Sequence, residues 1–426
     1  MTCRERLAAT LRHEEPDRLC VDFGATPVTG MHVAVVDRLR RAVLGEAEWR
    51  VRVCEPFQML GEIDDRLRAA LGIDTLGVYG RTSLLGTDED GWKPLMLFDG
   101  TNVLVPHNFN FTVEPGTGDW LMHPQGDRSV PPSARMPAGG NFFDAIVRQP
   151  PIDEDRLDPA DNCEEFGLLG PEALVHYAAW RDRLSAGAGA GTVLMMPGTA
   201  FGDIALVPAP FLKHPKGIRD IEEWYVSTAI RRDYIRAIFE RQLAFAEANL
   251  ATLAAMLGDL VQVVMVTGTD FGTQSGSFVS IDDYRDLFKP FHAQVNRIIH
   301  RTTPWKSFIH SCGSNRDLLP EFIDAGFDIF NPVQCSAARM EPRELKKEFG
   351  RQLVFWGGGV DTQKTLAFGS PAEVYREVRE RIDIFAPGGG FVFNAVHNVQ
   401  ANVPLANVEA MFRALDDARG IAGRPA

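Results

Sequence analysis

A histidine and a cysteine lie two positions apart at the end of an apolar run in the second half of the chain. The stretch FIHSCGSN, residues 308–315, places one serine between His310 and Cys312. In extended backbone, side chains two residues apart point to the same side, so both can approach one ion. Zinc readily accepts imidazole nitrogen and thiolate sulfur, and catalytic zinc usually has three protein ligands. The pair therefore predicts half of a zinc site, the alternative being a buried histidine packed beside a buried thiol.

A third zinc ligand has to come from elsewhere in the chain. Cys335 follows the next apolar run, and His397 follows a later one near the C-terminal end. Both residue types are common zinc ligands. The spacing leaves both candidates open.

Further polar residues also come directly after short apolar runs: Asp270 after 261–267, Asn331 and Gln334 after 327–330, Asp361 after 352–356, and His397 after 390–396. Asp270 is expected to orient a ligand, accept a substrate proton or become a fourth ligand. Asn331 and Gln334 are expected to hold substrate as polar lining of the site. Asp361 fits a simple loop turn equally well.

The elements that position these residues alternate between helix and strand. Helical periodicity covers 231–257, 280–302, 315–326, 341–350, 370–389 and 404–418, and short apolar runs lie between these segments. Uninterrupted apolar strands between helices are typical of a parallel sheet that is buried on both faces. Because no GxGxxG follows the first strand, the pattern favours an α/β (β/α)8 TIM barrel over a doubly wound sheet. In such a barrel, the residues after the strands meet at one mouth.

The first half of the chain is less regular. Helices are expected near 32–45 and 59–72, and a strand at 74–80. Residues 86–140 alternate aromatic and aliphatic residues with Gly, Asp and Pro, which predicts a set of β-hairpins. A minimal barrel needs about 250 residues. We therefore expect one barrel domain over 1–426, with 86–140 as a hairpin insertion that forms a wall or lid.

Composition narrows the class of protein. Hydrophobic residues make up 45% and charged residues 24%, with a net charge of −13. This acidic balance argues against a nucleic-acid partner. The six cysteines show no CxxC spacing, which favours a reducing, cytoplasmic setting. The charged start, MTCRERLAATLRHEEPDR, is unlike a signal peptide, and we expect no membrane span.

Four stretches of the sequence resemble the uroporphyrinogen decarboxylase superfamily. They are TCRERLAATLRHEEPDRLCVDFG at the start, HSCG at 310–313, NPVQ at 331–334 and FWGGGVDTQ at 355–363. The resemblance covers essentially the whole chain and is strongest after residue 260. The superfamily contains porphyrin decarboxylases and zinc-dependent, corrinoid-linked methyltransferases. The decarboxylases carry an arginine motif, MRQAGRY, where this chain reads CVDFGATPVTGMHVAVV, so the resemblance points to the methyltransferase branch.

In that branch, the resemblance implies a His-x-Cys pair and a third cysteine ligand that is followed by an asparagine ten residues later. In this chain His397 stands in place of that cysteine and is followed by Asn407. The implied zinc ligands are therefore His310, Cys312 and His397, rather than Cys335. A site with one thiolate and two neutral imidazoles is a stronger Lewis acid than one with two thiolates, which favours an O-methyl substrate.

The implied activity is methyl transfer between a small methylated substrate and the cobalt of a corrinoid. The chain lacks a DxHxxG corrinoid motif, so the cobalamin is expected on a partner protein or as free cofactor. A homodimer is compatible with this hypothesis. The alternatives are a cofactor-free decarboxylase acting on a porphyrin or non-porphyrin acid, and an accessory binding protein with little catalysis of its own.

Overall fold

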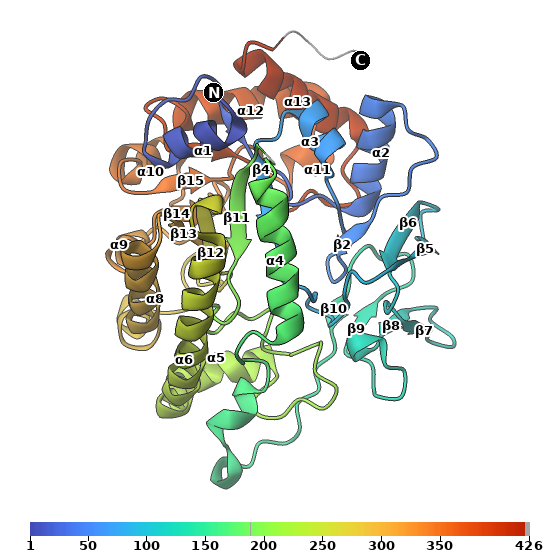
Figure 1. Ribbon diagram of the computed structural model, residues 1–426, viewed down its shortest axis with the longest axis vertical. Helices are drawn as coiled ribbons and strands as arrows, with labels where there is room; N and C mark the ends of the chain where they lie inside the picture. The colour runs from blue at the N-terminus through green and yellow to red at the C-terminus, as the bar shows by residue number, and fades with distance from the viewer. Residues whose placement is uncertain (188, 422–426) are drawn as a thin grey trace.

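Eight parallel strands form a barrel that is enclosed by helices, as Figure 1 shows for the computed structural model. The structure describes residues 1–187 and 189–421. The strands lie in the order β1-β16-β15-β14-β13-β12-β11-β4, and all seven neighbouring pairs are parallel. Their bounds are β1 Cys20–Val21, β4 Thr75–Val78, β11 Gly191–Met195, β12 Val263–Thr267, β13 Lys306–His310, β14 Ile329–Asn331, β15 Val354–Trp356 and β16 Phe391–Phe393. The predicted (β/α)8 barrel is confirmed.

Helices connect these strands. The α-helices are α1 Cys3–Leu11, α2 Val33–Leu44, α3 Asp65–Leu71, α4 Pro171–Ser185, α5 Ile221–Ile230, α6 Arg232–Leu257, α7 Ile281–Asp283, α8 Lys289–Thr302, α9 Leu319–Asp324, α10 Pro342–Phe349, α11 Thr365–Phe368, α12 Pro371–Phe385 and α13 Leu405–Ala418. A π-helical turn, Tyr284–Phe288, joins α7 to α8. Side-chain caps explain where several of these helices begin. The Ser280 side chain accepts from the Asp283 amide, and Ser370 forms a capping box with Glu373.

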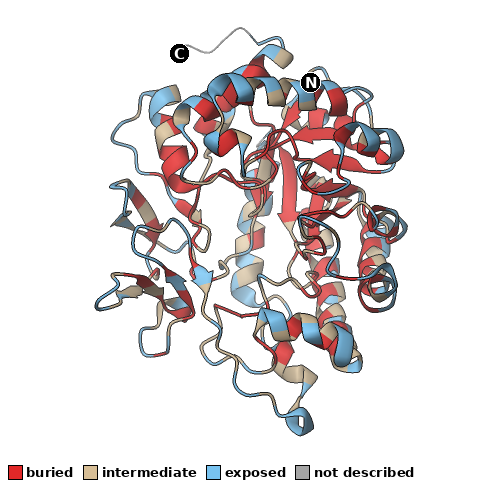
Figure 2. Cartoon of the chain, turned by 180° about the vertical axis from the view of Figure 1, so that it is seen from behind, coloured by how far each residue is buried: buried red, intermediate tan, exposed pale blue. Residues whose placement is uncertain are grey.

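Successive side chains along each barrel strand face two different buried regions. Val263, Phe308, Ile329 and Val392 belong to one cluster inside the barrel, while the residues between them face the helices. Because side chains alternate along a strand, a residue two places after an inward one also points inward. This period places His310 above Phe308, and Figure 2 shows the strands as the most deeply buried part of the molecule.

The Asp74 carboxylate lies at the seam where the barrel closes between β1 and β4. The Asp74 amide donates to the Val21 carbonyl at 2.8 Å, and the Val21 amide donates to Asp74 Oδ2 at 3.0 Å. Arg6, Arg18 and Arg419 also donate to this buried carboxylate, at 2.6, 3.0 and 3.2 Å. Asp74 therefore ties the barrel seam to α1 and to the end of α13.

The insertion leaves the barrel after β4. It contains a hairpin of β5 Trp92–Met96 and β6 Asn102–Pro106, and an antiparallel sheet of β7 Phe111–Val113, β8 Trp120–Met122, β9 Ala134–Met136 and β10 Asp144–Ala145. Hairpins are thus present within 86–140. In Figure 1 they lie at the end of the barrel away from α1, as expected for a segment that follows a strand's carboxyl end. A lid function remains a prediction.

The helix expected over 59–72 is only partly correct. Residues 65–71 form α3, but β3 Leu60–Gly61 pairs antiparallel with β2 Val53–Glu55. The added Cβ of a residue at Gly61 would lie 2.9 Å from Val33 Cα, so close packing on α2 fixes this segment as a strand. Tertiary packing overrides the apolar spacing here.

Helix α6 continues into a short 3-10 turn, and the combined segment Arg232–Leu260 is long and apolar enough to cross a membrane by length and composition. Its inward residues, including Ile235, Phe239 and Leu253, are buried in the core of the protein. The segment is therefore accounted for as one of the helices that cover the barrel. A cytoplasmic location remains a prediction.

Candidate metal site

Three metal-ligating side chains meet at the mouth of the barrel. One ligand atom from each of His310, Cys312 and His397 lies within 4.8 Å of the other two. The Cys312 Sγ is 3.3 Å from His310 Nε2, and the two imidazole rings are edge-on with centroids 5.4 Å apart. For zinc bonds of about 2.0–2.3 Å in a tetrahedral site, ligand atoms lie roughly 3.3–3.8 Å apart. The donor set and its spacing therefore fit one zinc ion.

The HSCG stretch is held in a tight turn after β13. Asn315 Nδ2 donates to the carbonyls of Ser311 and Cys312 at 2.9 and 2.8 Å, which fastens the turn from within. Gly313 has φ +85°, and a Cβ there would lie 2.5 Å from the Gly272 carbonyl carbon. Only glycine suits this close approach in the left-handed region. The turn brings Cys312 Sγ back toward the His310 ring.

The three residues predicted as catalytic all support this turn. Asp270 Oδ1 accepts from the Cys312 amide at 2.6 Å, and Gln334 Oε1 accepts from the Gly313 amide at 2.8 Å. Asn331 Oδ1 lies 2.6 Å from His310 Nδ1. All three therefore hold the predicted ligands in place.

The three side chains differ in burial and in how many of their polar atoms are already bonded to protein. The expectation that Asn331 lines the pocket for substrate does not fit, because Asn331 is fully buried and both ends of its amide bond to protein. Gln334 is also buried and uses its oxygen on the turn. The Asp270 side chain is 27% exposed, and its Oδ1 lies 3.9 Å from His310 Nε2. Asp270 therefore remains open to a substrate or to a fourth coordination position.

His397 reaches the site from the turn after β16. The Val396 amide donates to Val360 O at 3.0 Å, and Asn398 Oδ1 accepts from the Gly30 amide at 2.6 Å. Asn398 Nδ2 also donates to Pro27 O and Gln58 Oε1, both at 2.8 Å. The residues on either side of His397 are thus fastened to neighbouring loops, which fixes the position of the imidazole.

Cys335 and Asp361 have other surroundings. The Cys335 thiol donates to Val333 O at 3.4 Å, outside the group of three ligand atoms. Burial raises the pKa of that thiol to about 12. Asp361 accepts from the amides of Gln363 and Lys364 at 2.8 and 2.7 Å, as in an ordinary loop turn. The geometry brings His397, and not Cys335, to His310 and Cys312.

Burial sets the protonation states of the site. It lowers the pKa of His310 and of His397 to about 4, so both rings are neutral near pH 7. Burial, together with the Asp270 carboxylate, raises the pKa of Cys312 well above its ordinary value. Neutral imidazole is the form that binds metal, whereas the thiol has to lose its proton when an ion enters.

Sequence reasoning missed an acidic residue at the neighbouring strand end. Asp203 follows β11. Its carboxylate lies close to Gly268, just after β12, because a Cβ added to that glycine would be 2.8 Å from Asp203 Oδ2. The pKa of Asp203 is raised to about 6, mainly by burial and further by the charge of Asp270. The hydrogen bond that Asp203 accepts from the Ala205 amide acts in the opposite direction and lowers the pKa. The apolar run before it, TVLMM at 192–196, carries the same strand-end signal that identified Asp270.

An aromatic pair was also missed. Tyr225 of α5 donates its hydroxyl to the Asp270 carbonyl at 3.2 Å. Its ring stacks on Phe278, with centroids 5.1 Å apart, and Phe278 is 55% exposed. Neither residue lies in a strand-end motif, so the sequence offered no signal for them.

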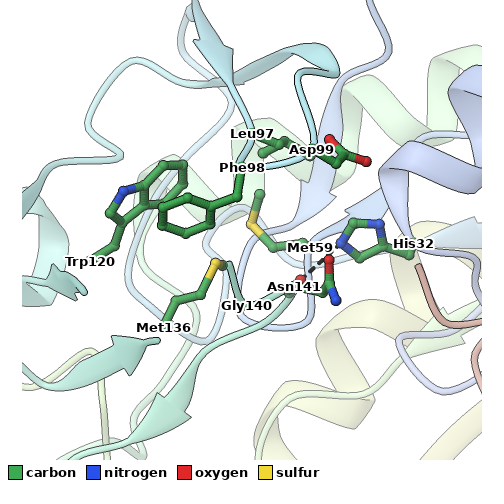
Figure 3. A pocket seen from close by; sticks show the side chains of 9 residues that line it. All are labelled: His32, Met59, Leu97, Phe98, Asp99, Trp120, Met136, Gly140 and Asn141. Carbon is green, nitrogen blue, oxygen red and sulfur yellow. Dashed lines mark hydrogen bonds between the residues drawn. The ribbon is translucent and has the colours of Figure 1, made fainter. Parts of the chain in front are cut away.

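A separate hollow lies between the insertion and the start of α2 (Figure 3). His32 forms one wall; its Nε2 donates to Asn141 O at 2.8 Å and its Nδ1 accepts from the Ala34 amide at 3.2 Å. Both ring nitrogens are used in structure, and none of the three metal-site residues lines the hollow. The hollow is therefore distinct from the metal site.

A model of the uroporphyrinogen decarboxylase (URO-D) family matches residues 237–418, which include every predicted site residue. This match agrees with the resemblance noted from the sequence.

A solved structure of a methyltransferase from Methanosarcina mazei is similar over 98% of this chain and 99% of that chain, with a TM-score of 0.51 and 16% identity. At this identity the likeness shows a shared fold. Comparison with curated protein sequences gave no match.

Proposed function

We propose that the protein is a zinc-dependent methyltransferase that moves a methyl group between a small methylated substrate, preferably an O-methyl compound, and the cobalt of a corrinoid. The observation that carries the proposal is the convergence of His310, Cys312 and His397 at the barrel mouth. The match of the URO-D family model to residues 237–418 supports it. The corrinoid is expected on a partner protein or as free cobalamin.

His310, Cys312 and His397 would hold the zinc through two neutral imidazoles and one thiolate. This set leaves the ion with a positive charge of about one unit, and the bound ion supplies Lewis acidity toward a leaving group. Because both histidines are already neutral near pH 7, only the Cys312 proton has to leave on loading. Asp270, beside the Cys312 amide, is positioned to accept that proton.

The residues around the ligands define the rest of the pocket's chemistry. Asp270 keeps one oxygen free of the Cys312 amide, so it can orient a substrate at the mouth. Asp203 has a pKa raised by burial to about 6 and is suited to hold a proton for a departing oxygen. Tyr225 and Phe278 offer an apolar face on the rim for the body of the substrate.

A cofactor-free decarboxylase is the second candidate. It is favoured by one observation, the acidic pair Asp203 and Asp270 at adjacent strand ends, where burial raises the pKa of both. Such a pair can deliver a proton to a carbanion after carbon dioxide leaves. The metal requirement separates the two candidates.

The test combines metal analysis with methyl transfer. Purified protein should contain close to one zinc per chain. It should methylate cobalt(I) cobalamin, followed by absorbance, from a member of a panel of methoxylated aromatics, methylamines and methyl thioethers. Cys312→Ala should lose most of the zinc and the transfer while the barrel remains folded by circular dichroism. Metal-free wild-type protein that keeps full activity would refute the proposal and favour the decarboxylase.

A further inference from the structure

The orientation of the Asn331 amide is fixed by its two contacts. Its Nδ2 donates to the Trp356 carbonyl at 2.8 Å, and its Oδ1 lies 2.6 Å from His310 Nδ1. Only the NH₂ end of an amide can donate to a carbonyl, so the oxygen end has to face the imidazole. Since Asn331 is fully buried, no solvent competes for either contact.

The tautomer of His310 follows from this orientation. An amide oxygen accepts but cannot donate, so His310 Nδ1 carries the proton and Nε2 carries the lone pair. A second contact agrees, because the Cys312 thiol lies 3.3 Å from Nε2 and can donate its proton there. The nitrogen that faces Cys312 and Asp270 is therefore the one free to bind a metal.

The chain makes room for this amide with a glycine. Gly357 follows Trp356 in the turn after β15 and has φ +89°, and a Cβ on it would lie 3.1 Å from Asn331 Nδ2. A side chain there would press on the amide and strain the turn. Gly357 thus permits the close approach of two strand ends.

We propose that Asn331 is a positioning residue that selects the Nδ1–H tautomer of His310 and so presents Nε2 to the metal. The inference rests on the proposed function only in its metal-binding part, because the tautomer exists without the ion. Histidine ligands are commonly oriented through their second nitrogen, by a carboxylate, a carbonyl or water. An amide does the same without adding negative charge, which preserves the Lewis acidity that an O-methyl donor requires.

The experiment compares three variants with wild-type protein. Asn331→Leu removes both contacts, whereas Asn331→Asp keeps an acceptor for His310 and loses the donor to Trp356. Asn407→Leu is the matched control. Asn407 is also buried and donates to two carbonyls, those of Leu366 and Gly369, at 2.9 and 2.8 Å. Thermal melting establishes that each variant is folded.

The first readout is the tautomer in metal-free protein, from the ¹⁵N resonances of the imidazole in histidine-labelled samples. Wild type, Asn331→Asp and Asn407→Leu should show a protonated Nδ1 on His310, and Asn331→Leu should lose that preference. A protonated Nε2 in wild-type protein would overturn the inference. A merely structural role would instead give Asn331→Asp and Asn331→Leu the same spectrum, which would also overturn it.

The second readout is zinc affinity, by competition with a chromophoric chelator. Asn331→Leu should bind zinc about 10–100-fold more weakly than wild type, and Asn407→Leu should be unchanged. Equal affinities in wild type and Asn331→Leu would overturn the inference. If wild type binds no zinc but shows the expected tautomer, the proposed function fails while the assignment of Asn331 is supported.

Discussion

Replacing His397 by alanine tests the metal site most directly. The change removes one of the three proposed zinc ligands from the cluster. Zinc sites with four ligands contribute about 10–16 kcal/mol, or roughly 2.5–4 kcal/mol for each ligand. At about 1.4 kcal/mol for a tenfold change, His397→Ala should weaken zinc binding by roughly 10²–10³-fold.

The fold should tolerate this substitution. In the part of the chain that the structure describes, the His397 ring makes no hydrogen bond, and its flanking turn is held through Asn398 and the Val396 amide. The thermal midpoint of metal-free His397→Ala should therefore stay close to that of metal-free wild type. Any loss of zinc then reports on coordination.

The assay is a chelator competition with methyl transfer measured on the same samples. Cys335→Ser is the control, because the Cys335 thiol lies outside the cluster and donates to Val333 O. It should keep zinc and most activity, while His397→Ala should lose transfer. The reasoning is refuted by the reverse pattern, in which Cys335→Ser loses zinc and His397→Ala retains it.

Three further predictions concern one buried core histidine and the surroundings of the site. Burial lowers the pKa of His292 to about 3, so its native ring stays neutral while the unfolded chain takes up a proton below pH ~6.5. The neutral native ring therefore contributes fully to the free energy of unfolding above that pH, and this contribution falls in acid. Between pH 7 and pH 5, the free energy of urea unfolding should drop by about 2 kcal/mol more in wild type than in His292→Phe, and equal drops would contradict the prediction. Gly313→Ala places a Cβ 2.5 Å from the Gly272 backbone at φ +85° and should lower the unfolding free energy by about 2–5 kcal/mol with loss of zinc. Gly276→Ala, where a Cβ meets open space, should change neither, and a matching loss there would count against the argument. Asp270→Ala leaves the Cys312 amide without its acceptor and should cost about 1–3 kcal/mol, whereas Asp270→Asn should keep the stability but slow methyl transfer; identical unfolding of the two variants would show that the 2.6 Å contact is unimportant.

The barrel could be predicted because its strands are short apolar runs placed between periodic helices. The runs 261–267 and 306–310 became β12 and β13 within two residues. The alternation rule also placed His310 and Cys312 on one side, and the strand-end rule brought His397 near them. These features depend on local chemistry, which the sequence carries.

Side-chain direction could not be predicted in the same way. Asn331 and Gln334 were correctly placed near the site, yet the Asn331 oxygen faces His310 and the Gln334 oxygen accepts from the Gly313 amide, so neither oxygen is offered to a substrate. Which way an amide points depends on the neighbouring strand, and that contact spans twenty-one residues for each of these pairs. Tyr225 reaches the Asp270 carbonyl from α5, a helix that carries none of the strand-end motifs.

The carboxylate of Asp74 has a consequence for how the molecule opens. It joins the β1–β4 seam, α1 through Arg6 and the end of α13 through Arg419, so elements from both ends of the sequence share one buried contact point. Terminal helices usually fray alone, at little free-energy cost. Here neither helix can separate without exposing the seam, so the slowest amide hydrogens of α1 and α13 should exchange together with those of the central strands. The barrel is then one cooperative unit, and the elements that open last lie at the end farthest from its mouth. A ligand can be released at the mouth while the ring of strands stays closed.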